Sequence, residues 1–199
     1  PNFSDDGHSW RGGYGPRLRH WHGVDQIGAV RERLLEDPTS RQAVMVLFDP
    51  ARDFQPSKDI PCNNWLGWLI RDNQLHMSAA LRSNDVWWGL SGVNAFEWSI
   101  LHEMLAFWIG VDVGRADYLA MSFHLYEKHF DRGEQAVKGF HGLTPYDFGV
   151  QRAAFVTSWE RFPDKLQRWF DLEGQISEQP DAPLGSFGTV GDPLLDGGL

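Results

Sequence analysis

The sequence has one cysteine, four lysines among its 18 basic residues, and no long hydrophobic run. A single cysteine excludes an intramolecular disulfide and any metal site built from several cysteines. No apolar stretch approaches the roughly 18 residues that a membrane-spanning helix needs. The first residues, PNFSDDGHSWRGGYG, are polar and do not resemble a secretory signal. These absences predict a cytoplasmic protein that does not enter a membrane.

Positive charge is also scarce, because the formal net charge is −9. A protein without a basic field does not gather nucleic acid, so binding of DNA or RNA is not expected. A small anionic substrate is compatible with this charge, since a phosphate needs only a few local arginines. Of the 18 basic residues, 14 are arginine.

Aromatic residues, in contrast, are abundant. The 199 residues include ten Trp and 13 Phe, and 42% of the chain is hydrophobic. This length is sufficient for one domain with a full core. Flat aromatic side chains suit both a core and a pocket for a planar ligand. Composition alone does not separate the two.

The pattern of apolar residues predicts an α+β fold in which a mixed or antiparallel sheet packs on a long buried helix. Residues 75–81 alternate as in a strand with one buried face, and residues 93–109 carry apolar residues at helical spacing. We expect a catalytic domain over 1–170 and a Pro/Gly-rich extended tail over 171–199. The other expected elements are a loop over 1–23, helices over 24–36, up to 138 and over 151–162, and strands over 43–48, 65–70 and 117–126.

Cys62 is the first candidate for chemistry. A lone cysteine is most often a small core residue. The segment DIPCNNW, however, follows a loop and precedes a strand, where a side chain can face a cleft. A nucleophilic cysteine also needs a nearby cation that lowers its thiol pKa, and Arg82 and Arg41 are candidates.

Two further segments carry clustered polar side chains. RSND (82–85) could bind a phosphate and accept a hydrogen bond from a ring N–H, although such a string is more often a polar turn. In SFHLYEKHF (122–130), Ser122, His124 and Tyr126 alternate and would share one side of a strand. That polar face indicates either a site or a solvated edge.

Taken in order, these segments resemble thymidylate synthases. VDQIGAVRERLLEDPTSRQAVMVLF resembles the family's DQ…L…DP-S-R-R segment, and PCNN stands where the family has its PPCH nucleophile motif. LRSNDVWWGLSGVNAFEWSIL resembles QRSxDxxLGxPFNIxxYxxL, and SFHLYEKHF resembles xxHxYxNH. The match runs from residue 14 to residue 130 in register, except for one extra residue in GLSGVN. Family members carry a further N-terminal segment, which we expect this chain to lack.

The resemblance implies a catalytic group of Cys62, Tyr14, Asn63 and Arg82. Cys62 would add to C6 of a pyrimidine nucleotide, so that C5 can attack 5,10-methylenetetrahydrofolate. Tyr14 would assist proton removal from C5, and Arg82 would lie near the thiol. Asn63 stands in the place of the family's histidine. No metal is implied.

The resemblance also implies the binding residues and the assembly. Asp85 would bind the pterin ring of the folate. A homodimer formed through the sheet is implied as well, in which Arg41 reaches the phosphate of the neighbouring subunit's site. The implied nucleotide-binding residues are Arg41, Arg82 and Ser83 for the phosphate, Asn94 for the pyrimidine edge, and His124 and Tyr126 for the sugar hydroxyl.

Departures from the family pattern favour a hydroxymethyltransferase. Gln42 replaces a second phosphate-binding arginine, and the C-terminal DGGL differs from the hydrophobic tail that closes the synthase site. An open site would admit water, which yields a hydroxymethyl group in place of a methyl group. Asn94 favours uracil, because an amide complements N3–H and O4. It does not exclude cytosine, since an amide can rotate.

Three other functions compete with this prediction. One is a true thymidylate synthase, which methylates dUMP reductively. A second is a non-catalytic nucleotide-binding module, which would tolerate replacement of Cys62. The third is an unrelated hydrolase built from Cys62, His124 and Asp85, which would need no folate.

Overall fold

The computed structural model describes residues 4–198. The chain divides into two compact units, Pro1–Val137 and Lys138–Leu199, and each is described by itself. Within the described residues, no helix is both long and apolar enough to cross a membrane. The predicted cytoplasmic location stays a prediction.

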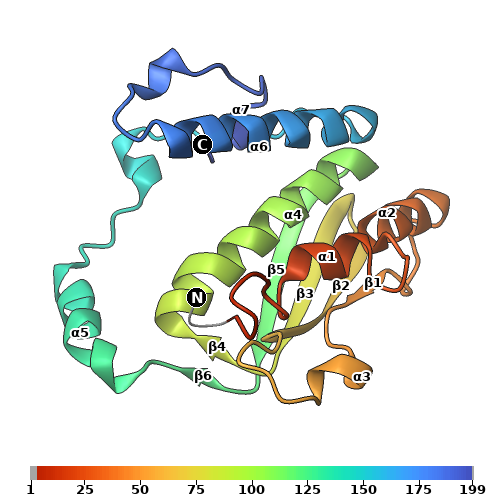
Figure 1. Cartoon of the computed structure of the whole chain (residues 1–199). Coiled ribbons are helices and arrows are strands. Elements are labelled where there is room, and N and C mark those ends of the chain that lie inside the picture. Colours follow the sequence, from red (N-terminus) through yellow and green to blue (C-terminus); the bar gives the residue numbers. More distant parts are fainter. Residues whose placement is uncertain (1–3, 199) are drawn as a thin grey trace. The chain divides into compact units, whose positions relative to one another are not determined.

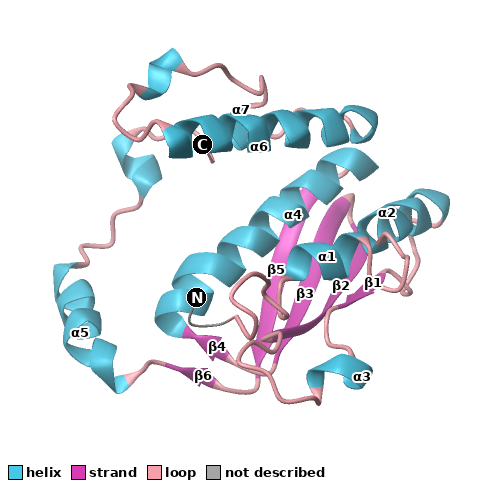
Figure 2. Cartoon of the chain, viewed as in Figure 1, coloured by secondary structure: helices cyan, strands magenta, loops and turns pink. Residues whose placement is uncertain are grey.

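The first unit is a mixed sheet covered by helices (Figures 1 and 2). Its sheet has the order β1-β2-β3-β5, in which β1, β2 and β3 are antiparallel neighbours and β5 is parallel to β3. The predicted α+β class with a mixed sheet is therefore confirmed. The strands are β1 (Val44–Val46), β2 (Asn63–Arg71), β3 (Gln74–Leu81), β4 (Asn84–Asp85), β5 (Asp112–Ala120) and β6 (Phe123–His124). The helices are α1 (Tyr14–Arg19), α2 (Gln26–Glu36), α3 (Pro50–Asp53), α4 (Asn94–Ile109) and α5 (Phe130–Gly139), with a π-helical segment η1 (Val86–Val93) and a 3-10 turn η2 (Glu127–His129).

The hairpin β2–β3 forms as the sequence predicts. Leu75, Met77, Ala79 and Leu81 are all buried, so one face of β3 forms the core. The two turn residues, Asp72 and Asn73, both have positive φ, which matches the right-handed twist of the flanking strands. This turn sets the register from Arg71 to Trp65, and a shift in the register between Asn63 and Trp65 then brings Asn63 opposite Leu81.

Helix α4 crosses from the end of β3 back to the start of β5. It follows η1 directly and ends at Gly110, whose φ of 84° lies in the left-handed region that glycine adopts without strain. The wide π-helical turn of η1 lies where the sequence has one residue more than the family pattern. The predicted helix over 93–109 is confirmed. In Figure 1, α1, α2 and α4 lie on one face of the sheet.

Some predicted elements are wrong. Residues 14–19 form α1 and are not loop, and the strand expected over 117–126 begins earlier, as β5. Parallel pairing with β3 sets the start of β5 at Asp112. Its side chains alternate little in burial, so the sequence carried a weak strand signal there.

The second unit also differs from the predicted helix and tail. Residues 151–158 have no regular structure; α6 instead spans Phe162–Glu178, and its second residue is a proline, which favours a helix start. The predicted extended tail is therefore wrong up to Glu178. The domain division 1–170 stays a prediction, although residue 170 lies inside α6. The short helices η3 (Pro145–Phe148), η4 (Trp159–Arg161), η5 (Leu184–Ser186) and α7 (Pro193–Asp196) complete this unit.

Asp192 ties the second unit together. Its buried carboxylate accepts hydrogen bonds from the hydroxyl of Thr157 at 2.6 Å and from the backbone amide of Val156 at 2.9 Å. It also caps α7 by accepting from the amides of Leu194 and Leu195. These bonds hold the pKa of Asp192 below its ordinary value, although burial alone would raise it.

Candidate active site

Cys62 lies at the end of a loop, one residue before β2, and its side chain is half-buried. The backbone of Arg82 pairs with it, because the Arg82 amide donates to the Cys62 carbonyl at 2.9 Å. The Arg82 guanidinium donates to the carbonyls of Pro61 at 2.9 Å and Ile60 at 2.7 Å. Arg82 therefore fixes the loop that carries Cys62. Its predicted effect on the thiol stays a prediction.

Tyr14, the first residue of α1, contacts the residue that follows Cys62. Its hydroxyl oxygen accepts hydrogen bonds from Asn63 Nδ2 at 2.7 Å and from the Asn63 backbone amide at 3.3 Å. Burial raises the pKa of Tyr14, and the neighbouring Cys62 adds to this, whereas the two bonds from Asn63 act in the opposite direction. Tyr14 is therefore a neutral phenol at pH 7, with an O–H that can donate to a ligand or water.

Three buried asparagines extend from this contact. Asn63 Nδ2 also donates to Asn94 Oδ1 at 3.2 Å, and Asn94 Nδ2 donates to Asn84 Oδ1 at 3.2 Å. Trp98, on the inner face of α4, donates from its indole nitrogen to Asn63 Oδ1 at 2.9 Å. We call Trp98, Asn63, Asn94 and Asn84 the amide network. It joins the start of β2, the start of α4 and strand β4.

Gly89 allows this network to close. A Cβ at this position would lie 2.1 Å from Asn84 Oδ1 and 3.2 Å from Asn94 Nδ2. No side chain fits there unless one of the asparagines moves, so the glycine in η1 permits the close approach.

Asp85 combines a capping role with an unused oxygen. Its Oδ2 accepts from the Trp88 amide at 2.7 Å and caps η1. Its Oδ1 is buried and accepts no hydrogen bond from the described residues. An acceptor left in this state is costly unless a ligand or water supplies a donor.

His124 lies beside Asp85, because β4 pairs with β6 and these two residues are opposite each other. The rings of His124 and Tyr126 meet edge to face at 4.9 Å, and Ser122 Oγ lies 3.1 Å from His124 Nδ1. The alternating trio was predicted to line one strand, but β6 is only two residues long. Pairing of β4 with β6 places the RSND segment beside the His124 segment.

The two remaining predicted site residues, Ser83 and Arg41, are less closely connected to the residues around Cys62. Ser83 is half-buried between Arg82 and the buried Asn84. Arg41 is exposed. The register of β1 on β2 directs residues before Val44 towards the end of β2 that lies away from Cys62. Along that direction Ala43 already lies beside Trp68. Arg41 is therefore not brought to Cys62 within one chain.

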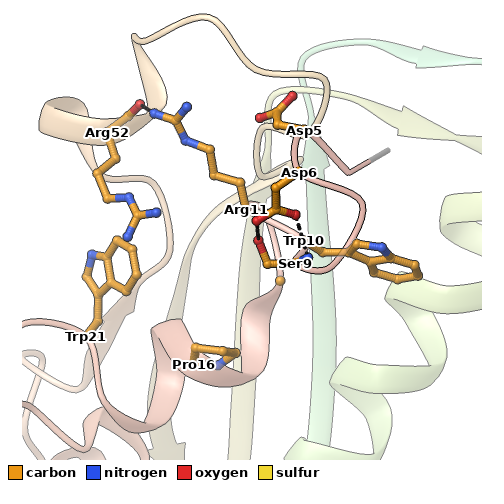
Figure 3. Close-up of a pocket in the computed structure, with 9 residues that line it drawn as sticks. Asp5, Asp6, Ser9, Trp10, Arg11, Pro16, Trp21 and Arg52 are labelled. Carbon is orange, nitrogen blue, oxygen red and sulfur yellow. Dashed lines mark hydrogen bonds between the residues drawn. The ribbon is translucent and has the colours of Figure 1, made fainter. Parts of the chain in front are cut away.

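A pocket of about 360 Å³ lies elsewhere in the first unit (Figure 3). In it the Arg52 guanidinium stacks on the Trp21 indole at 4.9 Å, and Asp6 accepts a hydrogen bond from Ser9 at 2.6 Å. Its charged groups thus already have partners within the protein, and none of the predicted site residues lines it. The lining consists of Asp5, Asp6, Ser9, Trp10, Arg11, Gly13, Pro16, Trp21 and Arg52.

Sequence reasoning missed three residues of the site. Asn84 was part of a motif but received no role. Trp98 is one of the apolar residues of the predicted helix over 93–109, a pattern that indicates its burial but not its hydrogen bond. Gly89 had no signal apart from its place in a tight turn. The three share one feature, contact with an asparagine of the amide network, and that contact depends on the fold.

Comparison with known proteins points to one family. The thymidylate synthase family model matches residues 2–145. The deoxyuridylate hydroxymethyltransferase of Bacillus phage SP01 is 38% identical over 178 residues, 83% of this chain and 46% of that protein. A relative from Methanosarcina barkeri, named provisionally as a thymidylate synthase, is 38% identical over 127 residues, 63% of this chain and 58% of that protein.

A solved structure agrees. The thymidylate synthase of T4 phage aligns with a TM-score of 0.57 and 25% identity, covering 62% of this chain and 42% of that one. The chain spans about half the length of the curated relatives it matches. With the sheet, the cysteine loop and the amide network in place, the chain belongs to the thymidylate synthase family.

Proposed function

We propose that this chain transfers a one-carbon unit from 5,10-methylenetetrahydrofolate to C5 of a pyrimidine nucleoside monophosphate and leaves it as a hydroxymethyl group. The observation that carries the proposal is that Asn63, the residue after Cys62 and the first of β2, contacts both Tyr14 and the buried Asn94. The name of the phage SP01 relative supports the hydroxymethyl product and dUMP as substrate.

Cys62 would act as the nucleophile. Its thiolate forms a bond to C6, the electron pair of the C5=C6 bond moves to C5, and C5 becomes able to attack an electrophilic carbon. Arg82 holds the loop in which Cys62 sits, through its hydrogen bonds to two of the loop's carbonyls. When bound, the folate supplies that carbon at the oxidation level of formaldehyde.

Tyr14 and Asn63 would manage the proton at C5. Because Tyr14 is neutral, it would donate its hydroxyl hydrogen to a water that takes the C5 proton, and it would not take this proton itself. Asn63 keeps the Tyr14 oxygen in place through two hydrogen bonds. The C5 proton would leave as the bond between the transferred carbon and the folate nitrogen breaks, and a water would add its hydroxyl to that carbon. Breaking of the Cys62–C6 bond then restores the pyrimidine.

The folate site would include Asp85. Its buried, unpartnered Oδ1 fits a pterin, whose ring N–H groups are donors. Arg82 and Ser83 would bind the nucleotide phosphate. His124 and Tyr126, which contact each other beside β4, would bind the sugar hydroxyl.

A homodimer through the sheet would complete the site. The face of the sheet opposite the helices carries exposed apolar side chains in neighbouring positions, Val44 and Val46 on β1 and Trp65 and Leu69 on β2. A second copy would bury them. Arg41 would then serve the phosphate of the partner's site, which suits its distance from Cys62 along β2.

The test is mass spectrometry of the products from dUMP, dCMP, UMP and CMP, each incubated with 5,10-methylenetetrahydrofolate and the full-length protein. Cys62→Ala should abolish product, and Asn64→Ala, a change to the same residue type outside the amide network, should retain it. A hydroxymethyl product supports the proposal. A methyl product with dihydrofolate would identify a thymidylate synthase, and nucleotide binding without any product would indicate a binding module.

A further inference from the structure

The amide network has a fixed polarity. An asparagine amide has a donor side and an acceptor side and can in principle present either one. Trp98, however, has only a donor, its indole N–H. The group of Asn63 that faces Trp98 must therefore be the acceptor, Oδ1, which turns Nδ2 towards Asn94.

The same logic continues along the network. The atom of Asn94 that meets Asn63 Nδ2 must be Oδ1, so Asn94 Nδ2 turns to Asn84, which answers with its own Oδ1. Burial makes each reversal costly, since the exposed fractions of Asn63, Asn84 and Trp98 are 0%, 2% and 2%. Flipping one amide would place donor against donor and acceptor against acceptor.

Asn94 keeps hydrogen-bonding capacity after these contacts. An amide has two N–H hydrogens and two lone pairs on oxygen, and the network uses one of each. One donor and one acceptor, in a fixed order, remain for a ligand. Uracil offers a donor at N3 and an acceptor at position 4, whereas cytosine offers the reverse.

We propose that Trp98 and Asn84 are positioning residues that lock the Asn94 amide in one orientation, and that this lock makes the protein bind dUMP in preference to dCMP. The inference rests on the proposed function and on the role that the family resemblance implies for Asn94, contact with the pyrimidine edge. A locked amide also decides between uracil and cytosine, which an Asn94 amide that is free to rotate would not do. Mispairing of a buried polar edge costs about 1–3 kcal/mol, or about fivefold to 140-fold in affinity.

The experiment compares dissociation constants of dUMP and dCMP by isothermal titration calorimetry on the full-length protein without folate. The variants are Asn84→Ala, which removes the last acceptor; Trp98→Phe, which removes the first donor; and Asn84→Asp, which keeps an acceptor facing Asn94. Asn64→Ala is the matched control. We expect the ratio of the two constants to fall about tenfold or more in Asn84→Ala and Trp98→Phe, and to stay within about threefold of wild type in the other two.

The ratio separates positioning from mere stability, because general damage to the site would weaken both nucleotides equally. Discrimination in the wild-type protein that Asn84→Ala leaves intact would overturn the lock while leaving the proposed function standing. Failure of the wild-type protein to bind either nucleotide would overturn both. If Trp98→Phe does not fold, Asn84→Ala alone decides.

Discussion

Replacement of Asp53 by asparagine should destabilise the first unit strongly. Asp53 and Arg17 form a two-pronged ion pair, with both nitrogen–oxygen distances at 2.7 Å. Their side chains are 0% and 1% exposed. The pair joins α1, which carries Tyr14, to α3, which precedes the Cys62 loop. An asparagine side chain in this place would keep the shape but would present an amide N–H₂ to a buried guanidinium.

The magnitude follows from the buried charge that remains. Breaking a buried pair from one side costs about 3–5 kcal/mol. Arg17 would keep two carbonyl partners, Leu47 and Arg11, so we expect the lower end, about 3 kcal/mol. Urea unfolding followed by tryptophan fluorescence measures it. With a slope of about 1–3 kcal/mol per M, the midpoint should fall by about 1–3 M.

The exposed pair Arg115–Asp117 supplies the control. Its partners are 76% and 51% exposed, so Asp117→Asn should change stability by less than about 1 kcal/mol. An Asp53→Asn variant that loses no more than Asp117→Asn would refute the reasoning, because the buried charge would then carry no cost.

The pH dependence of this loss has a definite sign. Burial would raise the pKa of Asp53, but the hydrogen bonds from Arg17 and the Asp49 amide outweigh it, and the pKa lies below its ordinary value of 3.8. The stability that the carboxylate contributes is therefore complete above about pH 4 and is lost as pH falls through the lowered pKa. The difference in free energy of unfolding between wild type and Asp53→Asn should therefore become smaller only in strong acid.

Further predictions concern the site and the sheet. Gly89→Ala should cost about 1–3 kcal/mol of stability in the same urea assay, because its Cβ meets Asn84 Oδ1, whereas Gly139→Ala has open space and should cost nothing. Tyr14→Phe should lower kcat about 100-fold or more. The factor should be the same at every pH from about 6 to 9, because burial keeps the pKa of Tyr14 above 10. A loss of activity at alkaline pH in the wild type but not in the variant would contradict this. Val46→Asp should convert a dimer to a monomer in sedimentation velocity, and a variant that stays dimeric would exclude this face as the interface.

Elements whose signal lies within a short segment were predictable. Alternation from Leu75 to Leu81 indicated the strand that forms the core, and apolar spacing over 93–109 indicated α4. Elements set by distant partners were not. The start of β5 depends on its pairing with β3, and α1 depends on Arg17, whose partner Asp53 lies 36 residues away.

The candidate site divides in the same way. Cys62, Arg82, Asn94 and His124 stood out because each lies in a motif of the family. The residues that orient them did not, because their roles come from contacts across the fold: Trp98 reaches Asn63 over 35 residues.

Trp98 illustrates how burial in the core can hide a second role of a side chain. Its place on the buried face of α4 is explained fully by packing, and its exposure is 2%. Yet a buried indole needs an acceptor for its N–H, and the acceptor that the fold supplies is the residue after the nucleophile. A histidine at position 63, as in the family motif, would have a ring in place of this amide. Asn63 accepts from Trp98 and donates to Asn94, so two hydrogen bonds connect the tryptophan to the orientation of Asn94. Base selection in this chain would then depend on a core tryptophan as well as on the asparagine that contacts the base.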